Sequence, residues 1–198
     1  FKHQFGDKDV LKIKKIEATT NHDVKAVEYF IKDFFKKDKV LSGYIHLIHF
    51  GLTSEDVNSL AYAIMIKNGL SIHIKKLSDL LKILKTCSVK WKNIAFLSRT
   101  HGQAASPSTL GKEIKVYSKR IEKEINSLKS IKPLAKFSGA TGNYHTFVIA
   151  NDQIEWPKCN KKFVNSFGIE KNLFTTQIEP HDWIAELTQT ITLSLIHI

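Results

Sequence analysis

The stretch TSEDVNSLAYAIMIKNGLSIHIKKLSDLLKILK, residues 53–85, decides the fold because its apolar residues recur at helical spacing. Thr53 and Asp56 resemble a capping box, and acidic side chains suit the positive end of a helix. A helix of about 32 residues is about 48 Å long. We therefore predict one long helix here, with Gly69 as a weak point inside it. Its apolar stripe, in two groups with steps of three and four, is Val57, Ala61, Ile64 and then Ile74, Leu77, Leu81, Leu84.

The helical period extends over the rest of the chain. We expect one earlier helix from about Asp23, with Asn21 as its N-cap, and three later helices. The three later ones run from Ser106-Pro107 to Pro133, from about Trp156 to Phe167 with Gly168 as C-cap, and from Glu179-Pro180 to the chain end. A loop from about Ser88 to Ser106 and a glycine-bearing loop, FSGATGNYH, separate them. No strand signal competes, so the predicted fold class is all-α, an elongated helical bundle of long antiparallel helices.

The charge balance bears on the kind of partner. The formal net charge is +11, and all of the 30 basic residues except Arg99 and Arg120 are lysine. A solvated lysine-rich surface is the ordinary explanation. Base readout prefers the arginine fork, and no zinc-finger, RNP or coiled-coil signature is present. We therefore expect no nucleic-acid partner, and a small polyanionic substrate fits the positive field better.

Cellular context follows from what the sequence contains. No run of about 18 apolar residues is present, so we expect no membrane partner. Cys87 and Cys159 stand outside any C-x-x-C spacing, which favours neither a disulfide framework nor a zinc site, and a reducing compartment such as the cytoplasm is expected. The chain opens FKHQFGDKD and ends in an uncapped apolar helix, from which we expect a sequence truncated at both ends.

Polar clusters gather just before the predicted helices. Helix starts offer unpaired N–H groups and a positive dipole end, which suit phosphates and carboxylates. Each cluster alone is explained by capping, and His101 alone by an ordinary loop histidine. Together they favour an anion site without naming an enzyme. They are Asn21-His22-Asp23, Thr53-Ser54, Thr100-His101-Gly102-Gln103 and Thr175-Thr176-Gln177.

Five runs carry a resemblance to a known family, from about Ile16 to about Thr190. The chain resembles the adenylosuccinate lyases, especially their bacterial-type branch, within the fumarase and aspartase superfamily. The runs are ATTNHDVKAVEY (Ala18–Tyr29), HFGLTSEDVN (His49–Asn58), LSRTHGQAASPSTLGKE (Leu97–Glu113), GATGNYH (Gly139–His145) and TTQIEPHDWIAEL (Thr175–Leu187). Ala104 stands where the family usually has proline. The family's G-S-S-x-M-P-x-K-x-N loop and its N-terminal Arg-Tyr contact are not in these residues.

The resemblance implies a β-elimination without metal or organic cofactor. Adenylosuccinate would give AMP and fumarate, and the succinylated imidazole carboxamide ribotide would give its free carboxamide and fumarate. By the match, His101 is the general acid, since histidine donates protons near neutral pH. The base is a serine of the loop absent from this sequence, so the 198 residues alone are expected to be inactive. Two alternative hypotheses are that the chain is another fumarate-releasing lyase, such as one acting on argininosuccinate, or a non-catalytic basic helical scaffold.

The remaining roles also come from the resemblance. Asn21, His22 and Asp23 match the nucleotide-contacting segment, and Thr53 and Ser54 match hydroxyls that hold the substrate's anionic groups. The other implied substrate contacts are Thr100 and Gln177, and possible site residues are His49, Gln103 and Arg99.

The resemblance also implies a domain layout and an assembly. Residues 1–50 would end an N-terminal helical domain, and residues 51–198 would begin the central bundle domain, with the rest and the C-terminal domain missing. The helices starting near Ser54 and Pro107 should be antiparallel neighbours with their N-terminal ends far apart. Thr53-Ser54 and His101 would then serve one substrate only from different copies. This agrees with the family's homotetramer, whose sites draw on three chains.

Overall fold

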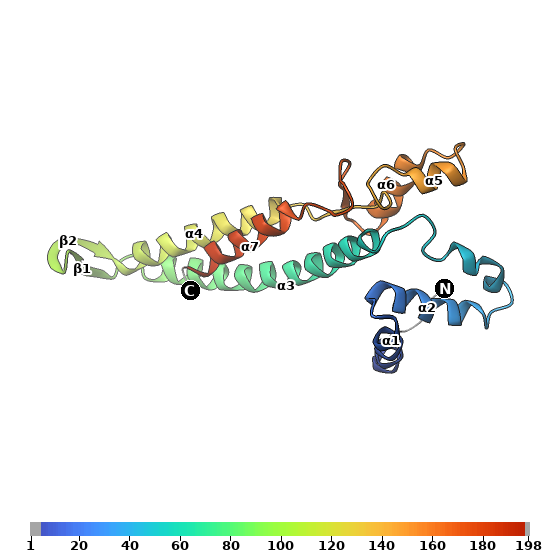
Figure 1. The fold of residues 1–198 in the computed structure, drawn as a ribbon. Helices are drawn as coiled ribbons and strands as arrows, with labels where there is room; N and C mark the ends of the chain where they lie inside the picture. Colours follow the sequence, from blue (N-terminus) through green and yellow to red (C-terminus); the bar gives the residue numbers. More distant parts are fainter. Residues whose placement is uncertain (1–4, 197–198) are drawn as a thin grey trace. The chain divides into compact units, whose positions relative to one another are not determined.

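The computed structural model describes residues 5–196 and divides them into two compact units (Figure 1). The first unit contains residues 5–62 and 134–180, and the second contains residues 63–133 and 181–196. Helix α3 (Ser54–Lys90) begins in the first unit and continues through the second. The predicted boundary at residue 50 between an N-terminal and a central domain stays a prediction.

The first unit is built from short helices around the start of α3. Its elements are α1 (Asp7–Thr20), α2 (Asp23–Phe35), the 3-10 helix η1 (Leu41–Leu47), β3 (Leu134–Ala135), α5 (His145–Ala150), α6 (Trp156–Ser166) and β4 (Glu170–Lys171). Strands β3 and β4 are a parallel pair of two residues each. Apolar side chains from distant segments close the interior, including Val24, Ala26, Phe30, Phe147, Val164 and Ile169.

Helix α1 is absent from our sequence-based prediction, and it corrects the assignment of Asn21. Asn21 adopts a left-handed conformation, with φ of 50°, and its N–H donates to Glu17 O, so it ends α1. The N-cap of α2 is His22, whose Nδ1 accepts the N–H of Lys25 at 3.3 Å. The expectation that Asn21 caps α2 was therefore wrong by one residue.

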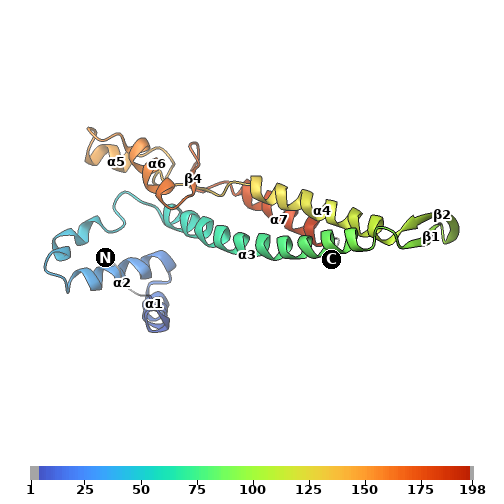
Figure 2. The same ribbon diagram turned by 180° about the vertical axis from the view of Figure 1, so that it is seen from behind.

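The second unit is a helical bundle. Helix α4 (Leu110–Ser130) packs against α7 (Asp182–Leu195), and both lie alongside residues 63–90 of α3 in the two views (Figures 1 and 2). The chain direction shows that α4 runs antiparallel to this part of α3, as predicted. The interior of this bundle contains Leu77, Ile121, Ile125, Leu128, Trp183 and Leu187.

A β-hairpin replaces the loop predicted from Ser88 to Ser106. Helix α3 continues to Lys90, and β1 (Ala95–Thr100) pairs antiparallel with β2 (Gln103–Thr109). The two residues of the turn both have positive φ, 53° at His101 and 75° at Gly102, which suits the right-handed twist of a hairpin. Pro107 is tolerated opposite Leu97 because the described sheet has two strands and both are edges.

Two predicted helix starts move towards the C-terminus. Helix α4 begins at Leu110 instead of Ser106-Pro107, and Thr109 is its N-cap, accepting the N–H of Lys112 at 3.3 Å. Helix α7 begins at Asp182 after His181, not at Glu179-Pro180. The all-α bundle class is confirmed, and the strands are minor additions. Among residues 5–196, no helix is both long and apolar enough to cross a membrane.

Candidate functional site

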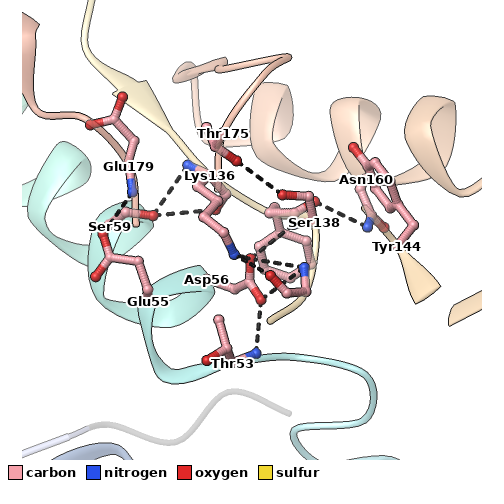
Figure 3. Close-up of polar contacts among 12 residues, drawn as sticks. Thr53, Glu55, Asp56, Ser59, Lys136, Ser138, Tyr144, Asn160, Thr175 and Glu179 are labelled. Atoms are coloured by element: carbon pink, nitrogen blue, oxygen red, sulfur yellow. Dashed lines mark hydrogen bonds and ion pairs between the residues drawn. The ribbon is translucent and has the colours of Figure 1, made fainter. Parts of the chain in front are cut away.

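The first turn of α3 organises a polar cluster in the first unit (Figure 3). The N–H of Thr53 donates to Asp56 Oδ2 at 2.8 Å, so the predicted acidic partner of the capping pair is confirmed. Asp56 is nevertheless fully buried, which capping alone does not require. Its carboxylate therefore has other partners.

Those partners come from the glycine-bearing loop that follows β3. Lys136 Nζ donates to Asp56 Oδ1 at 2.6 Å, and both side chains have 0% exposure. The backbone N–H groups of Ser138 and Gly139 also donate to this carboxylate, at 2.8 and 3.1 Å. Ser59 Oγ both donates to Lys136 O and accepts the N–H of Lys136, each at 3.2 Å. The glycine loop is thus fastened to the start of α3.

A second loop, residues 175–180, is attached to the same place. Ser138 Oγ lies 3.3 Å from Thr175 Oγ1, and the N–H of Glu179 donates to Glu55 Oε1 at 3.3 Å. Gly142 has a φ of 80°, and a Cβ there would lie 2.0 Å from the carbonyl oxygen of Thr175. Only glycine permits this approach. The loop that carries Gln177 therefore contacts both the glycine loop and α3, and Gln177 itself is exposed.

The start of α2 also reaches α3. His22 Nε2 lies 3.3 Å from Ser54 Oγ, so one residue of each predicted cluster is in contact with the other. Nδ1 of the same ring accepts the Lys25 N–H at 3.3 Å and lies 3.3 Å from Asp23 Oδ1, so His22 contacts both the start of its own helix and Ser54. A shallow open hollow adjoins this contact, lined by Lys14, Glu17, Ala18, Asn21, His22 and Asp23.

Lys171 and Tyr144 lie beside this network. Lys171 Nζ donates to the Tyr144 hydroxyl, and burial lowers the pKa of Lys171 and raises the pKa of Tyr144. The nearby Asp56 carboxylate opposes the shift of Lys171, whereas Lys136 adds to it. Lys136, Lys171 and Asp56 thus lie together, buried beside the glycine loop.

The remaining predicted site residues lie elsewhere. Arg99, Thr100, His101 and Gln103 form the exposed tip of the hairpin in the second unit, where Arg99 Nη1 donates to Gly102 O at 3.2 Å. Arg99 thus bridges the turn that carries His101, but the structure does not bring these residues into the unit of Thr53 and Ser54. His49 adopts φ of 65°, and its buried Nε2 has no hydrogen-bond partner among the described residues.

Sequence reasoning missed Lys136, Ser138 and Glu179. A signal existed in Asp56, an acidic residue following two hydroxyls at a helix start, but its long-range partner lies 80 positions away. Within residues 5–196, no three metal-ligating side chains converge, and both cysteines are free.

The chain matches a family model described as lyase over residues 2–198. It is 44% identical over 190 residues to the adenylosuccinate lyase of Buchnera aphidicola subsp. Schizaphis graminum, covering 96% of this chain and 42% of that protein. The adenylosuccinate lyase of Escherichia coli K12 is 44% identical over 184 residues, with 92% and 40% covered. The chain thus spans about 42% of the length of the first of these curated relatives.

Two solved structures share the fold at low sequence identity. A fumarate lyase from Mesorhizobium sp. BNC1 has a TM-score of 0.73 at 16% identity, covering 96% of this chain and 43% of the other. A 3-carboxy-cis,cis-muconate lactonizing enzyme from Pseudomonas putida has a TM-score of 0.76 at 15% identity, with 96% and 42% covered. These likenesses support the architecture alone.

Proposed function

Because the chain belongs to the lyase family, we propose that it releases fumarate by β-elimination from adenylosuccinate, leaving AMP, and from the succinylated imidazole carboxamide ribotide, leaving the free carboxamide. One observation carries the choice of substrate: 44% identity with curated adenylosuccinate lyases over almost the whole chain. The polar groups at the starts of α2 and α3 suit a substrate with phosphate and carboxylate groups.

The reaction needs one base and one acid. The base removes a proton from the carbon beside a substrate carboxylate, and that electron pair forms the carbon–carbon double bond of fumarate. The carbon–nitrogen bond breaks, its electron pair stays on nitrogen, and an acid protonates that nitrogen. We assign the acid to His101, which the exposed turn presents to whatever binds the hairpin tip. The base would be the serine of the family loop that residues 1–198 do not contain.

Substrate binding is assigned to the first unit. Asn21, His22 and Asp23 would contact the nucleotide, and Thr53 and Ser54 would hold anionic groups, supported by the 3.3 Å contact between His22 and Ser54. Gln177 would bind from its loop, and Thr100 from beside the acid. Arg99, Gln103 and His49 are secondary candidates. The reaction requires no metal or organic cofactor.

We assign the complete site to several copies of the chain, as a homotetramer in the cytoplasm without nucleic-acid or membrane partners. The support is that His101 and the Thr53-Ser54 pair belong to different compact units. No residue of either strand of the hairpin that carries His101 is buried, as expected for an element that enters a neighbouring copy. Residues 1–50 and 51–198 would belong to the N-terminal and central domains of each subunit.

The proposal is tested by assaying fumarate and AMP release from adenylosuccinate by the protein as the cell makes it. We expect both products in equal amounts, and no fumarate from argininosuccinate. Release from argininosuccinate alone would overturn the choice of substrate. Salt-sensitive DNA binding without affinity for AMP would instead support a basic scaffold. The isolated 198 residues, assayed in parallel, are expected to show no turnover because they lack the serine loop.

A further inference from the structure

We propose that Asp56 and Lys136 are positioning residues, a buried ion pair that fixes the hydroxyls of Thr53 and Ser54 and the loop of Gln177 in one arrangement. This inference rests on the proposed function, because the groups that the pair positions are the proposed substrate contacts. Neither residue is itself assigned a contact with substrate.

The burial of the pair is the first argument for this role. Both side chains have 0% exposure, and Lys136 Nζ lies 2.6 Å from Asp56 Oδ1. Removing two charges from water is expensive, and apolar residues of similar volume often stabilise a fold as well or better. Stability alone therefore does not explain a charged pair in this place. The directionality of its hydrogen bonds does.

The Asp56 carboxylate accepts three backbone N–H groups from two separate segments. Oδ2 accepts the N–H of Thr53 at 2.8 Å, which orients the residue just before α3. Oδ1 accepts the N–H of Ser138 at 2.8 Å, and Oδ2 accepts that of Gly139 at 3.1 Å. An apolar side chain cannot accept any of these donors, and each N–H would then be buried without a partner. The carboxylate is thus the common acceptor for the α3 start and the glycine loop.

Lys136 completes the arrangement from the other side. Its Nζ donates to Gly139 O at 2.6 Å as well as to Asp56. The glycine loop is thus held through its N–H groups by Asp56 and through a carbonyl oxygen by Lys136. The glycine loop in turn positions the loop of residues 175–180. It does so through the 3.3 Å contact between Ser138 Oγ and Thr175 Oγ1 and through the close approach of Gly142 to Thr175. Figure 3 shows the Lys136 side chain extending to Asp56, and the contact between Ser138 and Thr175 beside it.

The effect of losing the pair should fall on binding and not on proton transfer. Thr53 is bonded to Asp56 directly and the Gln177 loop through Ser138, whereas His101 lies in the hairpin of the other unit. In Asp56→Asn we expect the Kd for AMP and the KM to rise at least tenfold. The pH profile of kcat, which reports the proton donor, should keep its shape.

The experiment uses the assembled protein with Asp56→Asn, Lys136→Met and the double variant. The double variant removes both buried charges together, so it is expected to fold even if a single variant does not. Amide hydrogen exchange is measured at Ser138, Gly139 and residues 175–177, and AMP affinity is measured by calorimetry. The matched control is Lys32→Met, which removes a lysine partner of the buried Glu28 on α2, away from the glycine loop.

We expect faster exchange in both loops and weaker AMP binding in every Asp56 or Lys136 variant, with neither change in the control. Unchanged exchange at residues 175–177, or unchanged AMP affinity despite faster exchange, would overturn the positioning role. Failure of the proposed function is measured separately: the unmodified protein would then release no fumarate from adenylosuccinate. Hydrogen exchange needs no turnover, so the two failures are distinguishable.

Discussion

His22 Nε2 lies 3.3 Å from Ser54 Oγ, which joins the N-terminal end of α2 to the N-terminal end of α3. Each of these residues belongs to a polar cluster that capping alone could explain. Their contact places two helix starts, each with a positive dipole end, beside one another. This contact is one part of the proposed substrate site that lies within a single unit.

Replacing Ser54 by alanine should weaken nucleotide binding. A hydrogen bond to a charged group contributes about 1.5–3 kcal/mol, so Kd for AMP should rise by roughly 10- to 100-fold. Calorimetry on the assembled protein measures this. Ser71→Ala is the control, because Ser71 lies exposed on the same helix and its hydroxyl donates to Asn68 O. Equal affinities in the two variants would remove Ser54 from the site.

Replacing His101 by alanine should lower kcat while AMP binding largely survives. A positioned general acid contributes typically about 100- to 10,000-fold in rate. Steady-state kinetics with adenylosuccinate measure the loss, and an unchanged kcat would exclude His101 as the acid. His46→Ala, at another exposed histidine, should leave kcat unaltered.

Replacing Gly142 by alanine should destabilise the first unit. The new Cβ would lie 2.0 Å from Thr175 O at a φ of 80°, so backbone must move and a strained conformation must be held. We expect a loss of more than about 2 kcal/mol in the free energy of unfolding, measured by urea denaturation. Gly69→Ala, inside α3 with open space around it, should instead gain roughly 1 kcal/mol. Losses of similar size in both variants would contradict this account.

Glu122 should contribute to stability only above acidic pH. Hydrogen bonds from Lys119 and Lys85 lower its pKa from 4.5 to about 2 in the folded protein. A depressed carboxyl pKa stabilises the fold above the unfolded value, and this contribution disappears as pH falls from 4.5 to about 2. Glu122→Gln should therefore melt below the unmodified protein at pH near 7, as followed by circular dichroism.

The difference in melting temperature between Glu122→Gln and the unmodified protein should disappear as the pH falls towards the pKa of Glu122 in the folded protein. Glu155→Gln, which breaks an exposed pair between the residue before α6 and Lys158 in the first turn of α6, is the control and should show little difference at either pH. A gap for Glu122→Gln that stays constant across the acidic range would show that the carboxylate's charge is not responsible.

Local patterns predicted much of this architecture. The apolar spacing after Ser54 and the Thr53 to Asp56 signal indicated α3 and its first turn, and both are present. A glycine-bearing loop was predicted for residues 137–145, and Gly139 and Gly142 in it adopt positive φ. These features depend on residues a few positions apart, which is the range over which sequence patterns carry structural information.

What sequence reasoning missed depends on contacts between distant segments or on unusual turn residues. From the sequence, Asp56 is predicted only to cap α3. Its pairing with Lys136 joins residues 80 positions apart, and no local pattern indicates it. The hairpin went unrecognised because its turn is His101-Gly102 instead of Asn-Gly, and its strands lack a buried face with regular alternation. Helix α1 has few buried side chains, so its apolar pattern is weak.

The separation of Asp56 and Lys136 along the chain has an evolutionary consequence. A substitution that removes either charge alone leaves the other charge unpaired in the interior, so each single mutational step passes through a less stable protein. Among proteins that share this architecture, the residues at positions 56 and 136 are therefore expected to change rarely, and to change together when they do. Frequent substitution at one position without the other would contradict this expectation.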